Sequence, residues 1–218
     1  MLAVDTLASI AVPKQDTVAE QTVKGSKFIG SVARATSVDD ADAFIAAVRK
    51  VHFTANHNVF AYRIDRSDQA ARSSDDGEPS GTAGQPVMRQ IDRLGLAQIV
   101  LVVTRYFGGT KLGTGGLIRA YGDCAAEVLS QTPLETFVQV QEWIWQHTYD
   151  QTPEVTAMLH HQPVFVAHRS YDAAVSLTLW TATEDTDRIA RAAHDAVRGS
   201  SRLEPIRIRW VPASKIQD

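Results

Sequence analysis

Cysteine, long apolar runs and a basic N-terminus are scarce or missing in this sequence. Cys124 is the single cysteine, so no internal disulfide can form and a reducing compartment is expected. No run of about eighteen apolar residues is present. The first thirteen residues contain no Lys or Arg, unlike the start of a secretory signal. These absences predict a cytoplasmic protein without a membrane partner.

An excess of basic residues is also missing. The chain has 22 Lys and Arg against 25 Asp and Glu, which gives a formal net charge of −3. Proteins that bind duplex nucleic acid non-specifically are usually strongly basic, so any contact with nucleic acid here must be local. With 44% hydrophobic and 22% charged residues, the composition is that of an ordinary folded protein.

The length favours two domains. At 218 residues the chain exceeds the usual size of one domain, about 100–150 residues. The apolar period breaks at Thr132 and Pro133, and each half carries its own pattern of strands and helices. We therefore predict one domain at 17–131 and a second at 134–212.

The first half predicts a mixture of strands and helices after a frayed terminus at residues 1–16. Ser37 and Asp40 form a capping-box pattern at the start of one helix, and a continuous apolar run indicates a strand covered on both faces. The expected strands are 17–23, 26–35, 57–65 and 99–103, and the expected helices are 38–51, 84–94 and the segment with an apolar stripe over 117–129.

The second half predicts the order β-α-β-β-α-β. Its expected strands are 137–145, 164–169, 173–181 and 205–211, and its expected helices are 153–161 and 189–197. This order is that of the ferredoxin-like arrangement, so the fold class is α+β. The half has eight basic and eleven acidic residues, so we do not expect it to bind phosphates directly.

A glycine-rich loop between a buried strand and a helix is the strongest candidate for a binding site. Free backbone N–H groups and the helix dipole favour an anion in such a setting. The spacing matches neither the P-loop nor the dinucleotide-binding fingerprint. The alternative is that the glycines serve positive φ angles and close packing. The candidate residues for RNA or phosphate are Arg105, Gly108, Gly109, Lys111, Gly113, Gly115, Gly116 and Arg119.

An acidic loop precedes this region. Asp75, Asp76 and Glu78 could hold a metal ion together with His52 or His57, but their spacing matches no known metal loop. Capping of the loop by carboxylates that accept backbone N–H groups is the favoured alternative. We therefore predict no metal site and no cofactor.

No catalytic residue is predicted. Cys124 falls on the apolar stripe of the third helix, with Leu117, Tyr121 and Leu129, where a small buried side chain is expected. No serine stands in the G-x-S-x-G context of a hydrolase nucleophile.

Several motifs in the first half together resemble the signature of the IMPACT/YigZ family. They are KGSKFIG, HNVFAYRI, SSDDGEPSGTAGQP and VVTRYFGGTKLGTGGLIRAY, and the resemblance spans about residues 20 to 130. Val59 stands where many relatives have a cysteine. The resemblance implies a ribosomal protein S5 domain 2-like N-terminal domain, similar to domain IV of elongation factor G. It implies a ferredoxin-like second domain similar to domain V of that factor.

The resemblance also implies a role in translation. Eukaryotic members act in translational control through a protein partner, and the likeness to elongation-factor domains suggests contact with the ribosome or structured RNA. Hydrolase and dipeptidase names occur in the family, but no constellation in this sequence supports them. The expected function is non-enzymatic. The alternatives are an enzyme acting on a phosphorylated molecule or nucleotide, with the acidic loop holding a divalent ion, and a pure protein-interaction module.

Overall fold

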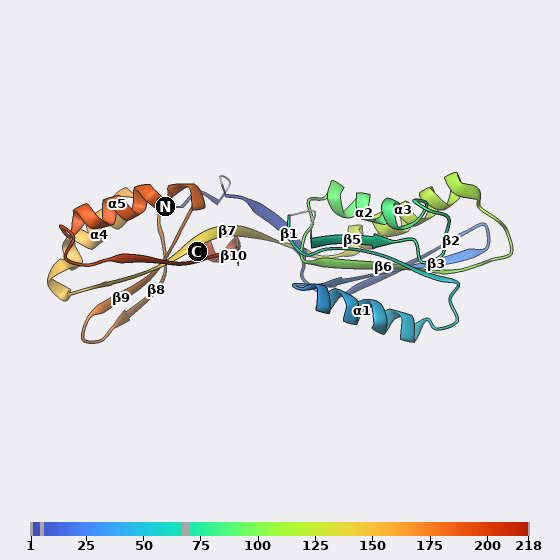
Figure 1. Cartoon of the computed structure of the whole chain (residues 1–218), viewed down its shortest axis with the longest axis horizontal. Coiled ribbons are helices and arrows are strands. Elements are labelled where there is room, and N and C mark those ends of the chain that lie inside the picture. Colours follow the sequence, from blue (N-terminus) through green and yellow to red (C-terminus); the bar gives the residue numbers. More distant parts are fainter. Residues whose placement is uncertain (1, 5–6, 67–69, 218) are drawn as a thin grey trace. The chain divides into compact units, whose positions relative to one another are not determined.

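The computed structural model describes residues 2–4, 7–66 and 70–217 (Figure 1). It divides the chain into two compact units. The N-terminal unit is Ile10–Glu135, and the C-terminal unit comprises Met1–Ser9 and Thr136–Asp218. These units take in residues before position 17 that the sequence analysis had placed in neither domain. No helix in the described part of the chain is long and apolar enough to cross a membrane.

The N-terminal unit is built on one antiparallel sheet with helices on both faces (Figure 1). The strand order is β2-β3-β6-β4-β5. The strands are β2 (Thr17–Val23), β3 (Ser26–Arg34), β4 (His57–Arg63), β5 (Ala71–Ser74) and β6 (Ile99–Tyr106), and the helices are α1 (Val38–Val51), α2 (Gly84–Arg93) and α3 (Gly113–Gln131).

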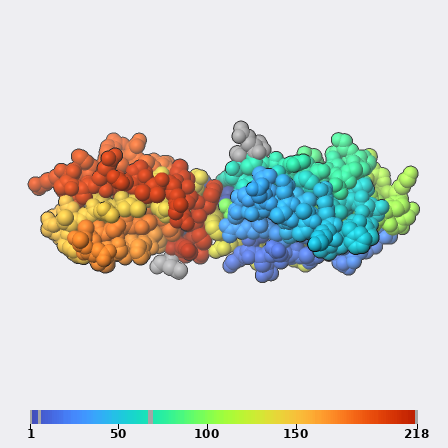
Figure 2. Space-filling view, turned by 60° about the horizontal axis from the view of Figure 1, so that its bottom comes forward, coloured from blue at the N-terminus to red at the C-terminus, as the bar shows by residue number. Residues whose placement is uncertain are grey.

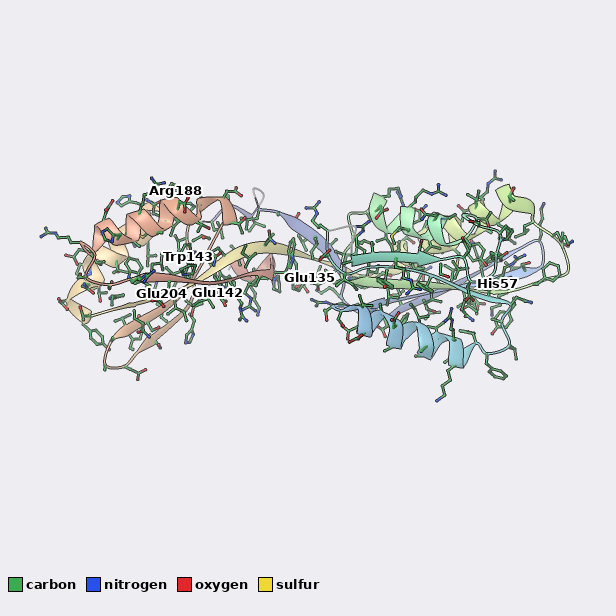
Figure 3. The ribbon with its side chains drawn as sticks, viewed as in Figure 1. His57, Glu135, Glu142, Trp143, Arg188 and Glu204 are labelled. Carbon is green, nitrogen blue, oxygen red and sulfur yellow. The ribbon has the colours of Figure 1, made fainter. Side chains whose placement is uncertain are left out.

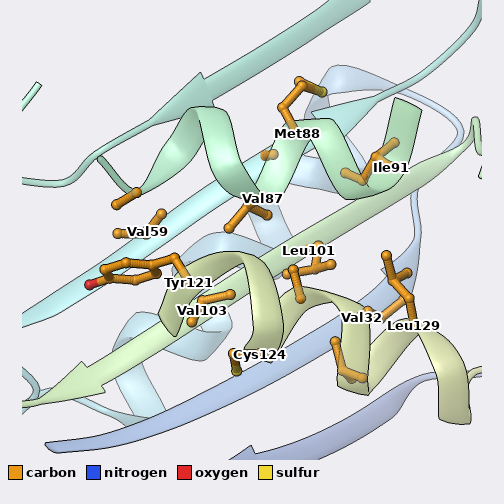
Figure 4. Packing of buried hydrophobic residues seen from close by; sticks show 14 of the residues in the cluster. Val32, Val59, Val87, Met88, Ile91, Leu101, Val103, Tyr121, Cys124 and Leu129 are labelled. Atoms are coloured by element: carbon orange, nitrogen blue, oxygen red, sulfur yellow. The ribbon is translucent and has the colours of Figure 1, made fainter. Parts of the chain in front are cut away.

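Strand β6 lies in the middle of this sheet and is covered on both faces. Leu101 and Val103 belong to the core under α2 and α3 (Figure 4). Val100 and Val102 belong to the core on the face that α1 covers. The continuous apolar run of the sequence therefore indicated a doubly covered strand correctly, although the strand continues to Tyr106.

Helix α1 begins and ends at the residues that the sequence predicted. The Ser37 side chain accepts a hydrogen bond from the Asp40 backbone N–H at 3.1 Å, and the Asp40 carboxylate accepts one from the Ser37 N–H at 3.0 Å. This capping box satisfies backbone donors that would otherwise lack partners at the helix start.

Helix α3 packs closely on β3 through its apolar stripe (Figure 4). A Cβ atom at Gly30 of β3 would lie 2.9 Å from a methyl carbon of Val128, so the glycine permits this approach. Cys124 is buried in the stripe, and burial raises the pKa of its thiol to about 12. The expected core position of Cys124 is confirmed, and the thiol stays protonated at neutral pH.

The C-terminal unit also follows the predicted order of elements. Its strand order is β10-β7-β9-β8, and β1 joins the sheet beside β7. Strands β1 (Ser9–Pro13) and β7 (Leu134–His147) each run across the boundary between the two units. The other elements are α4 (Thr152–His161), β8 (Phe165–Tyr171), β9 (Val175–Thr181), α5 (Thr186–Ala196), β10 (Leu203–Pro212) and α6 (Ser214–Gln217), with short 3₁₀ turns at Tyr149–Gln151 and Thr183–Asp185. Trp143, Trp145, Leu179 and Ile189 lie in one core cluster of this unit.

Two strands were missed in the sequence. Residues 9–13 were expected to fray, but β1 forms there and buries Ile10 and Val12. Residues 71–74 were expected to be loop, but they form β5, which pairs with β4. Both strands are short, and their state depends on pairing with distant segments rather than on a local apolar period.

Candidate functional site

Four connecting segments meet at one end of the sheet in the N-terminal unit, which we call the loop end. The strand register brings together the start of β3, the start of β4, the end of β5 and the end of β6. The segments are the Lys24–Gly25 turn and residues 52–56, 75–83 and 107–112. His57 marks this end in Figure 3.

A buried polar cluster lies beneath these segments, with Glu78 at its centre. Arg105 donates a hydrogen bond from Nη1 to Glu78 Oε1 at 2.6 Å, and the Tyr121 hydroxyl donates to the same oxygen at 2.7 Å. The side chains of Arg105 and Glu78 are only 7% and 4% exposed. His57 Nε2 lies 3.8 Å from Glu78 Oε1. The cluster is thus a neutralised ion pair in the interior.

This geometry corrects the role expected for Arg105. From the sequence we expect Arg105 to bind phosphate together with Lys111 and Arg119, but its guanidinium is paired with Glu78. The guanidinium also lies 5.5 Å from the ring centre of Phe28 and 5.7 Å from that of Phe107. Arg105 therefore holds the loop end together from below and does not present its charge to solvent.

Tyr121 serves the cluster as a hydrogen-bond donor. Burial raises the pKa of Tyr121 far above its ordinary value, and the hydrogen bond to Glu78 together with the negative charge of Glu78 raises it further. The phenol therefore keeps its proton at neutral pH. A role as general base or nucleophile does not fit this environment.

Asp75 caps the loop that leads into α2. Its carboxylate accepts hydrogen bonds from the backbone N–H groups of Gly81 at 2.8 Å, Ala83 at 2.9 Å and Gly84 at 2.8 Å. Burial alone would raise the pKa of Asp75, but these three bonds outweigh it and hold the pKa below its ordinary value. This is the loop-capping geometry that the sequence analysis favoured.

The other two acids have different partners. Asp76 accepts a hydrogen bond from Arg49 of α1 and another from the backbone N–H of Asn58, both at 2.6 Å. Its own carbonyl oxygen lies 2.8 Å from His57 Nδ1. Within residues 2–4, 7–66 and 70–217, no group of three or more His, Cys, Asp or Glu side chains is placed to hold a metal ion.

The glycine-rich loop after β6 packs against the turn between β2 and β3. The Gly108 N–H donates a hydrogen bond to Ser26 Oγ at 3.2 Å. A Cβ atom at Gly108 would lie 1.9 Å from the carbonyl carbon of Gly25. Gly109 and Gly113 have φ angles of +86° and +71°, which side chains rarely adopt. For these three glycines the structural alternative accounts for the residue type.

The start of α3 stays accessible. Gly113 and Gly115 have open space where a Cβ atom would be, whereas Gly116 faces the Leu112 side chain at 3.1 Å. The first turn has no acidic residue, and the side chains of Lys111 and Arg119 are exposed. Of the expected basic side chains, Lys111 and Arg119 remain available to an anion.

Two exposed aromatic side chains accompany these cations at the loop end. Phe53 is 83% exposed and Phe107 is 47% exposed. The Asn56 side chain accepts a hydrogen bond from the Phe107 N–H at 2.8 Å, which ties the segment after α1 to the glycine-rich loop. Helix α1 and the segment after it lie on the face shown in Figure 2, in blue to cyan.

Neither aromatic residue was among the site residues predicted from the sequence. A usable signal was present for each. Phe53 stands among polar residues between a helix and a strand, where no apolar period accounts for it. Phe107 stands between the end of β6 and the two glycines of the glycine-rich loop.

Replacing Asp75 with Asn should reduce the free energy of unfolding at pH 7 by about 1–2 kcal/mol, because a neutral amide satisfies the three backbone donors less well. The folded-state pKa of Asp75 is lowered, so its stabilisation is present above the ordinary value of 3.8 and is lost as the pH falls through the folded-state pKa. The difference between the two proteins should therefore shrink in acid. Urea unfolding at several pH values measures it, and a difference that is constant with pH would contradict the capping role.

The fold and site define an α+β protein with a glycine-rich loop held over a buried ion pair. A family model described as the Impact N-terminal domain matches residues 24–129. The chain is 32% identical to IMPACT family member YigZ of Escherichia coli (strain K12), over 90% of this chain and 98% of that protein. It is 45% identical to IMPACT family member YvyE of Bacillus subtilis (strain 168), over 51% of each chain.

The structural comparison agrees. A solved structure titled "Crystal structure of an hypothetical protein" is 32% identical in sequence, covers 91% of this chain and 98% of its own, and aligns with a TM-score of 0.62. The chain belongs to the IMPACT family, which confirms the resemblance seen in its motifs.

Proposed function

We propose that the protein is a non-enzymatic RNA- or ribosome-associated protein that modulates translation, and that it binds through the loop end. The observation that carries this proposal is the combination of exposed aromatic rings and exposed cations on the loops of this end and on helix α3. Phe53 and Phe107 supply the rings, and Lys24, Lys111 and Arg119 supply the charges. The buried cluster around Glu78 and the capped loop at Asp75 hold these loops in place.

The chemistry of RNA fits this surface. Unpaired bases stack on aromatic side chains, and phosphates bind Lys and Arg through charge. The whole chain has a net charge of −3, so the attraction must come from this local set of cations. Because Arg105 is neutralised by Glu78, Lys111 and Arg119 are the expected phosphate ligands in the glycine-rich region.

The finer fold assignment supports the same proposal. The order β7-α4-β8-β9-α5-β10 and the strand order β10-β7-β9-β8 fit a ferredoxin-like arrangement. We propose that the N-terminal unit has the ribosomal protein S5 domain 2-like fold. Together the two units would then resemble domains IV and V of elongation factor G, a factor that works on the ribosome.

An enzyme of nucleotide chemistry is the weaker proposal. Such an enzyme would need the acidic loop to hold a divalent ion. Asp75, Asp76 and Glu78 are instead engaged by backbone donors, by Arg49 and by Arg105. The exposed phenylalanines would equally suit a protein partner, which the experiment below separates from RNA.

Replacing both Lys111 and Arg119 with Gln should weaken binding to ribosomes or structured RNA uniformly across RNA sequences. The slope of log affinity against log salt concentration should become shallower by about one unit for each lost phosphate contact. The matched control is Arg89→Gln, which removes an exposed charge from α2. Co-sedimentation with ribosomal subunits and RNA titrations at several salt concentrations measure both quantities.

An unchanged affinity and salt slope in the double variant would remove the loop end as the RNA contact. A different result would favour the interaction-module alternative: the parent protein has no affinity for RNA, and the double variant loses binding to a protein factor.

A further inference from the structure

A cavity of about 300 Å³ lies within the C-terminal unit, bounded by α4, β7, β8 and β9. It is outside the segment matched by the family model. Three residues that line it are almost fully buried: Val155 is 1% exposed, Val175 is 2% exposed and Leu177 is 4% exposed. Ligand pockets of this size are usually apolar with a few placed polar groups. The apolar lining is Val155, Leu159, Val164, Val166, Val175 and Leu177.

Two polar groups lie in the buried part of this lining. His147 is 3% exposed, and its Nδ1 lies 2.9 Å from the Thr148 carbonyl oxygen. A carbonyl oxygen only accepts, so Nδ1 donates this hydrogen bond and Nε2 is the ring nitrogen left for a ligand. Thr152 Oγ1 is buried and has no hydrogen-bond partner among the described residues. Both groups can receive a hydroxyl group from a ligand.

The rest of the polar lining is exposed and includes one fixed positive charge, that of Arg169. His160, Arg169 and Tyr171 are exposed, and the residues that line the cavity include no Asp or Glu. No ion pair joins Arg169 to an acid in the described part of the chain. A guanidinium binds a carboxylate through two parallel hydrogen bonds. The exposed side of the cavity therefore favours a carboxylate.

The strand register separates the two kinds of polar group. His147 of β7 pairs with Val175 of β9, and Leu177 of β9 pairs with Arg169 of β8. Arg169 is thus two strands away from His147, a lateral distance of about 10 Å between backbones. One aromatic ring with a substituent at each end can span much of this distance, and the apolar walls would enclose the ring.

We propose that the C-terminal unit binds a small carboxylic acid with a flat or branched apolar body and a hydroxyl group at its far end. The carboxylate binds Arg169 beside His160. The hydroxyl donates to His147 Nε2 and adjoins Thr152. This site is independent of the RNA contact proposed for the N-terminal unit, so either proposal can fail alone.

The test uses 4-hydroxyphenylacetate as the probe with the full-length protein. NMR titration should give saturable shifts at backbone amides of α4, β7 and β9 around the cavity. Phenylacetate, which lacks the hydroxyl group, should bind about 3- to 10-fold more weakly. The amide 4-hydroxyphenylacetamide, which lacks the charge, should bind at least about 10-fold more weakly.

Arg169→Gln should abolish the preference for the acid over the amide, and because Arg169 is exposed the variant should remain folded. Arg191→Gln on α5 is the matched control, because Arg191 does not line the cavity. The proposal is overturned if none of the three compounds gives saturable shifts, if the shifts lie away from the cavity, or if Arg169→Gln keeps the full preference for the acid.

Discussion

Replacing Arg105 with Met should lower the free energy of unfolding of the N-terminal unit by about 3–5 kcal/mol, the cost typical of breaking a buried ion pair from one side. Methionine keeps most of the apolar volume of the arginine stem beside Phe28 and Phe107. The loss would thus come from Glu78, which is 4% exposed in its side chain and would be left without its charged partner. Urea unfolding followed by NMR signals of β3 and β6 measures this unit separately.

The double variant Arg105→Met with Glu78→Leu is the matched control. Removing both charges leaves no unpaired ion in the core, so the double variant should be more stable than Arg105→Met alone. The Tyr121 hydroxyl would lose its acceptor, which keeps the recovery incomplete. If Arg105→Met cost less than about 1 kcal/mol, or if the double variant were the less stable protein, the structural role assigned to this pair would be wrong.

The burial of Arg105 could have been predicted from the sequence by extending one rule. Side chains alternate between the two faces of a strand, so Arg105 shares the face of Leu101 and Val103. The strand predicted from the apolar run ends at Val103, which leaves Arg105 outside it as a candidate phosphate ligand. The partner of Arg105 could not be predicted. Glu78 lies in the loop between β5 and α2, and its contact with Arg105 depends on how that loop folds.

Elements with a complete local signal were predicted well. Helix α1 has a capping box at its start and an apolar stripe along its length, and its bounds were predicted without error. Helix α3 likewise has a stripe long enough to establish its buried face. These signals lie within the element itself, so no distant contact is needed to read them.

Two short strands that depend on distant pairing were not predicted. Strand β5 has the sequence Ala-Arg-Ser-Ser and no apolar alternation, and it becomes a strand because β4 supplies the hydrogen-bond partners. Strand β1 joins a sheet beside β7, more than a hundred residues along the chain. The aromatic surface of the loop end was missed for a similar reason, because exposure is decided by what the rest of the fold covers.

Replacing Gly108 with Ala should destabilise the N-terminal unit by about 2–3 kcal/mol, in the range of overpacked sites. The added Cβ atom would lie 1.9 Å from both the carbonyl carbon and oxygen of Gly25, and 2.3 Å from the Ser26 nitrogen. These are backbone atoms, which cannot rotate away as a side chain can. The glycine-rich loop must therefore move away from the turn between β2 and β3, which should break the hydrogen bond from Gly108 to Ser26.

Gly115→Ala is the matched control in the same region. Gly115 lies in α3 with open space around the Cβ position and without a positive φ angle, so alanine should be neutral or stabilising by up to about 1 kcal/mol. In urea unfolding, a lower free energy of unfolding for Gly108→Ala and an unchanged or higher one for Gly115→Ala would show that the close contact, and not glycine content, determines stability here. Equal effects would contradict that conclusion.

The Gly108→Ala variant also tests whether loop position matters for binding. Phe107 and Lys111 flank Gly108, so a displaced loop should present the ring and the charge in the wrong place and weaken RNA binding at temperatures where the variant is still folded. If Gly108→Ala lost stability but bound RNA with the affinity of the parent protein, the glycine-rich loop would be a structural element and the RNA contact would lie elsewhere on the chain.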